Sequence, residues 1–476
     1  MPMEQQGPDI DFYALGKNNQ LLLINGKNTS VSKSTVAITG LQSAETIMGI
    51  DFRPNTGQLF GVGSTSRLYV INPLTGEARA VGVDAFSPAI DGTSVGFDFN
   101  PTVDRIRLVS SSGQNLRLNP ETGVVAFTDG SINGAPGASV SAVAYTQSIA
   151  GATTTVLYDI DITTDKLYKQ NPPNTGTLVE VGSLGVDAEA AGGFDISADS
   201  AYALAALTVA GNSGLYIINL STGAATKAGK FNGEIIGLAI PTQAVAYAVC
   251  NTTKLFILDP NTGKISFTKM MTGLQAGENI KGLDMRPATG QLFALGSTSR
   301  LYTINIASGA ATEIGAGPFA TLLDGAAFGF DFNPTVDRIR VVSDNGQNLR
   351  LNPITGAVAF VDGMINPSTS KISGSAYTNN FFGATTTMLF DIDAQSDRLV
   401  KQDPPNMGTI VDIGPLGIDI DKSNGFDISG MGGKAYGIFT SGSSTKIYSI
   451  DLMTGTATVK AGFQEPVNGF TLGIGL

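Results

Sequence analysis

The sequence predicts an all-β protein, specifically a β-propeller with ten four-stranded blades that arise from a tandem duplication. Three observations predict it: long segments recur along the chain, short apolar runs alternate with glycine-containing turns, and long helical periodicity is nearly absent. Runs of about five Val, Ile, Leu, Phe and Tyr residues between such turns are typical of strands. Glycine occupies 59 of 476 positions, well above the roughly 7% of an average protein, which indicates many tight turns.

The duplication covers almost the whole chain. GFDFNPTVDRIR begins at Gly96 and recurs letter for letter from Gly329, 233 positions later. GSTSRLY keeps the same spacing, from Gly63 and from Gly296. We therefore expect a first five-blade repeat over 9–240 and a second over 244–476.

A shorter unit recurs inside each copy. In LYVINPLTG from Leu68 and LFILDPNTG from Leu255, a strand ends in a turn that Asn or Asp initiates and in which glycine supplies a positive φ. Two further strands precede this segment, as in MGIDF and QLFGVG, and one follows it, as in EARAVG from Glu77. Four strands with a period of about 40 to 50 residues are typical of a propeller blade.

The ends of the copies leave the number of rings open. The chain begins with the second strand of a blade, DFYALG from Asp11, and ends with an unpaired first strand, so we expect 467–474 to close the first blade or the second ring. GEIIGLAI from Gly233 either closes the first copy or begins the sixth blade. Only Pro241, Thr242 and Gln243 separate it from the next strand, AVAYAVC. Three extended residues reach about 10 Å, which is short for a bridge between two propellers. We therefore favour one ten-bladed ring over two five-bladed propellers.

The overall charge and hydropathy exclude several partners. The formal charge of −11 and the isoelectric point near 4.6 argue against nucleic acid and anionic membranes, which attract basic surfaces. No segment reaches the roughly 18 apolar residues of a membrane span, and the N-terminal residues lack the pattern of a signal peptide. The low-charge surface rich in Gly, Thr and Asn favours a secreted, periplasmic or cell-surface protein whose export signal lies outside this sequence.

Several kinds of chemistry are excluded by residue type. The chain has no histidine and one cysteine, Cys250, which removes His-based triads, imidazole metal sites and thiolate clusters. Cys250 lies in the apolar run AVAYAVC, as inert core cysteines do. No convincing helix follows a Gly-rich loop, as phosphate-binding motifs require. We expect no cofactor apart from structural calcium.

The strongest polar pattern lies in the third blade of each copy. Two arginines alternate with apolar residues and project from one face of a strand, with a third arginine on the next strand and aspartates nearby. We favour an inter-blade ionic network, because buried arginines need carboxylate or carbonyl partners. The alternative is a binding site for a carboxylate or an acidic sugar. The candidate ligand-binding residues are Asp98, Arg105, Arg107 and Arg117, with Asp331, Arg338, Arg340 and Arg350 as their equivalents.

A second pattern resembles the opening of a calcium-binding loop. Aspartates recur at the spacing of the first ligands of such a loop, but the turn glycine and the terminal glutamate are missing. Aspartate at a strand end also commonly only caps a turn. The candidate calcium ligands are Asp159, Asp161 and Asp165 in the first copy, and Asp391, Asp393 and Asp397 in the second.

Three motifs carry a family resemblance. GIDFRPNTGQLFGVG from Gly49, GFDFNPTVDRIRLVS from Gly96 and GQNLRLNPETG from Gly113 resemble the bacterial family known as domain of unknown function 4394. The resemblance spans both copies and implies an exported β-propeller. It implies no reaction and no functional residues, and the usual arrangement of the family is a single copy.

Two classes of function remain open. We favour a non-catalytic extracellular or cell-surface binding or scaffold protein whose partner is a protein or an extracellular glycan, and which could also associate with itself. The alternative is a histidine-free hydrolase or lyase that uses carboxylates and arginines on an extracellular substrate. The absence of Trp weakens a carbohydrate-active role, because sugar sites usually contain stacking aromatic residues.

Overall fold

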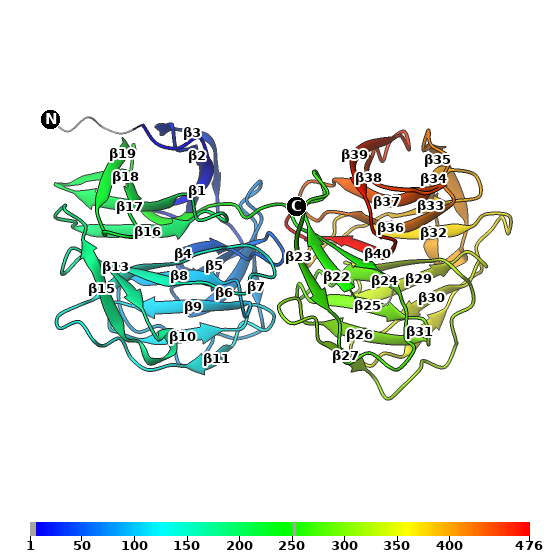
Figure 1. Ribbon diagram of the computed structural model, residues 1–476, viewed down its shortest axis with the longest axis horizontal. Helices are drawn as coiled ribbons and strands as arrows, with labels where there is room; N and C mark the ends of the chain where they lie inside the picture. Colours follow the sequence, from blue (N-terminus) through cyan, green and yellow to red (C-terminus); the bar gives the residue numbers. More distant parts are fainter. Residues whose placement is uncertain (1–5, 251–253) are drawn as a thin grey trace. The chain divides into compact units, whose positions relative to one another are not determined.

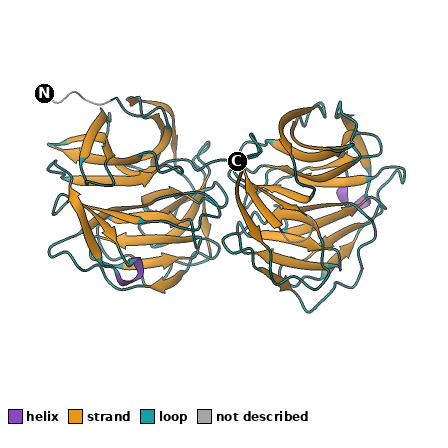
Figure 2. Ribbon diagram, in the orientation of Figure 1, coloured by secondary structure: helices purple, strands orange, loops and turns teal. Residues whose placement is uncertain are grey.

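The structure is a computed structural model that describes residues 6–250 and 254–476, and the chain divides into two compact units, 1–243 and 244–476 (Figure 1). The described part of each unit contains five four-stranded antiparallel sheets (Figure 2). One short 3-10 turn accompanies them in each unit, η1 (Pro173–Thr175) and η2 (Pro405–Met407). The prediction of an all-β propeller with ten blades is confirmed.

The strands of the first unit are, in chain order, β1 (Asp11–Gly16), β2 (Gln20–Asn25), β3 (Asn28–Ala37), β4 (Ile47–Phe52), β5 (Leu59–Gly63), β6 (Arg67–Ile71), β7 (Ala78–Val81), β8 (Val95–Asn100), β9 (Arg105–Ser110), β10 (Asn115–Leu118), β11 (Val125–Thr128), β12 (Val140–Tyr145), β13 (Leu157–Asp161), β14 (Lys166–Gln170), β15 (Leu178–Ser183), β16 (Ala190–Ile196), β17 (Ala203–Val209), β18 (Asn212–Ile218), β19 (Ala225–Lys230) and β20 (Ile235–Ala239).

The strands of the second unit are β21 (Ala246–Cys250), β22 (Lys254–Leu258), β23 (Ile265–Met270), β24 (Ile280–Met285), β25 (Leu292–Gly296), β26 (Arg300–Ile304), β27 (Ala311–Ile314), β28 (Phe328–Asn333), β29 (Arg338–Ser343), β30 (Asn348–Leu351), β31 (Val358–Val361), β32 (Ile372–Tyr377), β33 (Leu389–Asp393), β34 (Arg398–Gln402), β35 (Ile410–Pro415), β36 (Lys422–Ile428), β37 (Ala435–Ser441), β38 (Ser444–Ile450), β39 (Ala457–Phe463) and β40 (Val467–Leu472).

The Asx-initiated turns predicted from the sequence end the third strand of the blades. After β6, the side-chain carbonyl of Asn72 accepts a hydrogen bond from the backbone N–H of Leu74 at 2.9 Å. Gly76 completes the turn with a φ of 78°. A Cβ at this glycine would lie 2.1 Å from the carbonyl oxygen of Ala37 in the preceding blade, so glycine is required both by the backbone conformation and by this close approach.

Each unit closes its own circle of blades. In the first unit β20 pairs with β1 in the sheet β20-β1-β2-β3, and the innermost strands contact one another in the order β20, β4, β8, β12, β16 and back to β20. In the second unit β40 pairs with β21, and the corresponding circle is β40, β24, β28, β32 and β36. We refer to these ten strands as the inner strands, and to the centre of each circle as its axis.

The ten-bladed ring that we favoured is therefore wrong, and the two five-bladed circles are what the pairing produces. GEIIGLAI supplies the inner strand of the first blade, since β20 leaves Leu238 and Ala239 at most 3% exposed when it pairs with β1. This pairing also satisfies the edge of β1 within its own repeat. The C-terminal strand consequently closes the second circle and not the first blade.

Apolar side chains fill the spaces between neighbouring blades. In the first unit a separate apolar cluster lies between each of the five pairs of neighbouring blades, including the pair that β20 closes. Phe60 and Phe99, for example, meet edge to face between the second and third blades, with ring centroids 5.2 Å apart. This continuous packing around the axis holds the inner strands close together.

Candidate functional site

Six of the ten inner strands carry one short motif: glycine, an apolar residue, aspartate and a second apolar residue. It occupies 49–52, 96–99 and 193–196 in the first unit, and 282–285, 329–332 and 425–428 in the second. Side chains two residues apart share one face of a strand. The aspartate side chain therefore lies on the same face of the strand as the glycine two residues earlier, and this face is turned toward the next blade.

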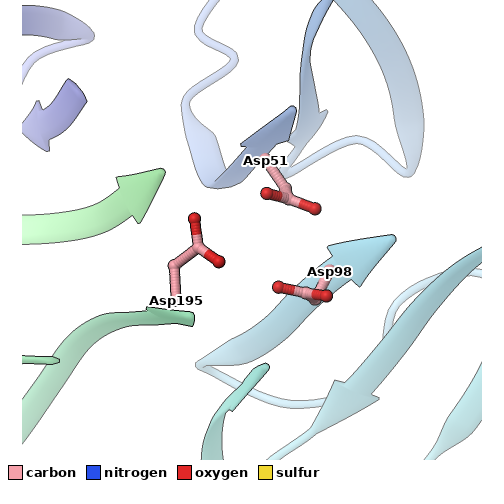
Figure 3. Close-up of side chains that lie close together, drawn as sticks. All are labelled: Asp51, Asp98 and Asp195. Carbon is pink, nitrogen blue, oxygen red and sulfur yellow. The ribbon is translucent and has the colours of Figure 1, made fainter. Parts of the chain in front are cut away.

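Three aspartates of the first unit meet at its axis. Asp51, Asp98 and Asp195 extend from β4, β8 and β16, and their carboxylates point toward one another (Figure 3). Each offers an oxygen that lies within 4.8 Å of the other two, and none of the residues is more than 3% exposed. We call these three residues the first axial cluster.

The second unit has the equivalent arrangement on β24, β28 and β36. Its members also lie within 4.8 Å of one another, and each is 1% exposed. We call this group the second axial cluster, and it consists of Asp284, Asp331 and Asp427.

Every axial carboxylate is held by a backbone donor of the following blade. The N–H groups of Phe99, Tyr145 and Ile240 donate to Asp51, Asp98 and Asp195 at 2.7, 3.1 and 2.6 Å. In the second unit Phe332, Tyr377 and Leu472 donate in the same way to Asp284, Asp331 and Asp427 at 2.7, 2.9 and 2.7 Å. These bonds fix the carboxylates and join neighbouring inner strands.

Burial makes the charged form of the axial carboxylates costly. It raises the pKa of Asp51 and of Asp98 well above the usual value, and the negative charges of the neighbouring aspartates raise both further. Burial also raises the pKa of Asp195 to about 7 and that of Asp427 to about 6. Three adjacent carboxylates cannot all ionise unaided, so each cluster either retains protons or requires a cation.

The two clusters differ at the inner strand of the composite blade. There the first unit has Ala239 and the second has Thr471, each two residues after a glycine. The hydroxyl of Thr471 lies 2.7 Å from Oδ2 of Asp427 and 3.1 Å from Oδ1 of Asp284. The second cluster thus contains one more side-chain oxygen than the first.

The arginine pattern forms a hydrogen-bonded network between the third and fourth blades. The guanidinium of Arg107, 1% exposed, donates to Asp129 at 2.6 Å, Asn115 at 2.7 Å, Asn174 at 2.8 Å and the hydroxyl of Tyr145 at 3.3 Å. Its nitrogens are thereby engaged with protein groups. The ionic network that we favoured from the sequence matches this geometry.

The other members of the predicted ligand-binding set do not assemble around a common space. Arg117 forms a bidentate pair with Asp129 and lies 4.0 Å over the ring of Phe127, whereas Arg105 donates to the carbonyl oxygen of Asp104. Asp98 belongs to the axial cluster. The second unit repeats this arrangement through Arg340 and Arg350 on Asp362, Arg338 on the carbonyl of Asp337, and Asp331 at the axis.

The predicted calcium ligands also take separate roles. Asp161 accepts the backbone N–H of Thr163 at 2.7 Å, as a turn cap does, and Asp165 accepts that of Ala188 at 2.9 Å. Asp159 is fully buried, and neither of its oxygens has a hydrogen-bond partner among the described residues. In the second unit Asp393 and Asp397 accept backbone N–H groups, and Asp391 is buried like Asp159. Neither set is among the carboxylate groups that converge in the described part of the chain.

Sequence reasoning missed four axial residues and assigned the other two to a different site. Asp51, Asp195, Asp284 and Asp427 were not predicted, while Asp98 and Asp331 were grouped with the arginines. The signal that could have identified them was the sixfold recurrence of aspartate two residues after glycine in the first strand of a blade. The fourth blades lack it, since SAVAY and SGSAY stand there.

Fold and site together define a class: propellers whose inner strands enclose a sealed group of carboxylates. The model of a family described as Domain of unknown function (DUF4394) matches residues 13–239 and 254–471. The chain belongs to this family, in two tandem copies, as the resemblance of its motifs predicted.

Comparisons with individual proteins add little to this assignment. No curated protein matches the sequence. The extracellular domain of the two component system BT4673 from B. thetaiotaomicron shares 10% identity at a TM-score of 0.28, over 98% of this chain and 72% of that one. The Dos1 propeller shares 12% identity at a TM-score of 0.26, over 71% of this chain and 92% of that one. At such scores the likeness carries no argument, and the propeller assignment depends on the strand pairing.

In the residues that the structure describes, no helix is long and apolar enough to cross a bilayer.

Proposed function

We propose that this chain is a non-catalytic binding or scaffold protein that acts outside the bacterial cytoplasm, with a protein or an extracellular glycan as its partner. One observation carries the proposal: every axial carboxylate accepts an N–H from the next blade and is at most 3% exposed. A general acid or base must come within hydrogen-bond distance of its substrate. Carboxylates enclosed between blades support a structural role.

The arginine networks support the same proposal. Substrate-binding arginines keep donors free for a ligand carboxylate or phosphate. Here Arg107 and Arg340 direct their donors at Asp129 and Asp362 and at nearby amide and hydroxyl groups.

Composition supports the location and the class of partner. The net charge of −11 disfavours polyanions, and charged residues make up only 14% of the chain. A protein or neutral glycan partner fits such a surface better than nucleic acid. The two repeats also offer two similar surfaces, which favours multivalent binding or self-association.

One observation favours the enzymatic alternative, a histidine-free hydrolase or lyase. Burial raises the pKa of Asp195 to about 7, in the range that a general acid needs at neutral pH. Such a role would require an opening of the first unit that exposes the axis.

A paired screen separates the two functions. The purified chain is applied to a glycan array and, in parallel, incubated with chromogenic glycosides and with acidic polysaccharides whose cleavage releases reducing ends. We expect saturable binding without turnover. Turnover that disappears in Asp195→Asn, with the circular dichroism spectrum unchanged, would establish the enzyme instead. Size-exclusion chromatography with light scattering measures self-association.

A further inference from the structure

We propose that the second unit binds one divalent cation on its axis, between the three carboxylates of the second axial cluster. The donor set consists of oxygens only, which suits Ca²⁺, Mg²⁺ or Mn²⁺ and not the nitrogen and sulfur sites of zinc. Ca²⁺ is the preferred ion, because it accepts irregular oxygen shells.

The spacing of the carboxylates fits a single ion. Each member of a cluster offers an oxygen within 4.8 Å of the oxygens of the other two. Two oxygens on opposite sides of a Ca²⁺ ion lie about 4.6 to 5.2 Å apart, and other pairs in its shell lie closer. One ion at the axis can therefore touch a carboxylate from each of three inner strands.

An unpartnered buried oxygen in the second axial cluster points independently to a ligand. Oδ1 of Asp331 accepts the N–H of Tyr377, whereas Oδ2 has no hydrogen-bond partner among the described residues, although Asp331 is 1% exposed. Leaving a buried carboxylate oxygen unpaired is costly. A cation held between Asp331, Asp284 and Asp427 satisfies this oxygen and offsets the repulsion between the three groups.

A further protein oxygen lies beside the second axial cluster. The hydroxyl of Thr471 is 2.7 Å from Oδ2 of Asp427 and 3.1 Å from Oδ1 of Asp284, so it is within reach of a cation between these carboxylates. A cavity of about 80 Å³ adjoins the cluster. Its lining includes Leu283, Phe330 and Phe426, each of which immediately precedes a member of the cluster, but none of the three carboxylates lines it.

The cation would join three inner strands that are far apart in sequence. Because the site exists only when the circle of blades is closed, binding selects the folded unit and stabilises it. The role is structural, and it is independent of which partner the outer surface binds.

Metal content of the wild-type chain tests the proposal first. The protein is stripped with EDTA, dialysed, and equilibrated with CaCl2, MgCl2 or MnCl2 before its bound metal is measured by mass spectrometry. We expect one ion per chain, and a melting temperature of the second unit that rises by about 5 °C or more when the ion is at 100 times its dissociation constant. Retention of no ion with any of the three salts overturns the proposal.

Paired substitutions then locate the ion. Asp331→Asn with Asp427→Asn should abolish metal binding. The matched control is Asp161→Asn with Asp393→Asn, which alters the turn aspartates and should retain the ion. Loss of metal in this control, or its retention in the axial variant, overturns the axial assignment.

A measurement on the wild-type chain covers the case in which the substituted proteins do not fold. Anomalous scattering from crystals grown with MnCl2 should show a peak at the axis of the second unit. The lack of a peak there, or metal that does not raise the transition temperature of the second unit, would contradict the proposal.

Discussion

Glu45 and Glu278 are buried glutamates, each 4% exposed, and they fix the start of the second blade of their unit. Glu45 accepts hydrogen bonds from the hydroxyls of Thr65 and Tyr69 and from the backbone N–H of Gln42. Glu278 accepts the hydroxyl of Tyr302 at 2.9 Å and the N–H of Thr298 at 2.7 Å. Burial, followed by the bond to the glutamate, raises the pKa of Tyr69 and of Tyr302 from 10.0 to about 12.

This pair of tyrosines predicts a loss of stability in alkali. Between pH 10 and 12 the unfolded chain releases these phenolic protons while the folded chain keeps them, so the free energy of unfolding falls as pH rises through this range. The double variant Tyr69→Phe, Tyr302→Phe should decline less steeply than the wild type, by the part of the slope that these two phenols contribute, and should lose about 1 kcal/mol per site at neutral pH. Urea denaturation at several pH values measures it.

The control for the alkaline prediction is Tyr202→Phe, because Tyr202 is 38% exposed. Its slope should match that of the wild-type chain. A double variant whose stability declines between pH 10 and 12 as steeply as the wild type would contradict the assignment.

Arg107 predicts the cost of breaking a buried ionic network. Arg107→Leu leaves the carboxylate of Asp129, 7% exposed, with Arg117 alone, and leaves Asn115 and Asn174 without their donor. We expect the free energy of unfolding to fall by about 3 to 5 kcal/mol, measured by urea denaturation. Arg105→Leu, which removes a bond to a backbone carbonyl, should cost less than about 1 kcal/mol. Equal effects of the two substitutions would show that the network is not what stabilises this region.

At the scale of the strand, glycine controls how closely the blades approach the axis. A Cβ at Gly282 would lie 2.4 Å from Cβ of Phe330 in the next blade, and one at Gly96 would lie 2.7 Å from the backbone nitrogen of Val143. Five inner strands enclose a small circle, so their backbones must come closer than side chains allow. The same closeness brings the aspartates two residues later within reach of one another.

Gly282→Ala tests this role of the inner-strand glycines. The added methyl group must push β24 away from β28, and we expect a loss of about 1 to 3 kcal/mol together with a weaker second axial cluster. Gly462→Ala in the outer strand β39 is the matched control, since no atom lies within 4 Å of its Cβ position. Thermal unfolding should separate the two variants. Equal melting temperatures would mean that the circle can widen without cost.

The strands were predictable because their signals are local. Alternating apolar residues, the Asx turns and Gly76 at positive φ are all visible within one blade of sequence. The axial clusters were not predictable from such local signals, because Asp51 and Asp195 converge only through the packing of several blades around an axis. The arginine network was predictable in part, since alternation in β9 placed Arg105 and Arg107 on one face. The partners of Arg107 were not, because Asp129 follows β11 and Asn174 lies in η1 of the next blade.

At the scale of the whole molecule, the number of circles was the least predictable feature. The strand over Ile235–Ala239 has the same composition whether it ends one circle or begins another. What decides is its pairing with β1, which satisfies the edge of the first blade within its own repeat. The short connection over 241–243 favoured a single ring, but it constrains only the distance between β20 and β21. It is compatible with two circles, because β20 is the edge strand of its sheet and β21 is next to the edge strand β40 of its own.

Independent closure predicts that the two units fold separately. Removal of the residues from Val467 onward deletes β40, which leaves β21 with an exposed edge and removes Thr471 from the second axial cluster. We expect the truncated chain to lose the cooperative transition of unit 244–476 while unit 1–243 unfolds at its original temperature, as calorimetry would show. The fragment 1–243 alone should give that same transition, because β20 already completes its first blade. If the truncation instead abolished both transitions, the two circles would depend on each other for their stability. Closure of a circle by its own last strand would then not be what stabilises that circle.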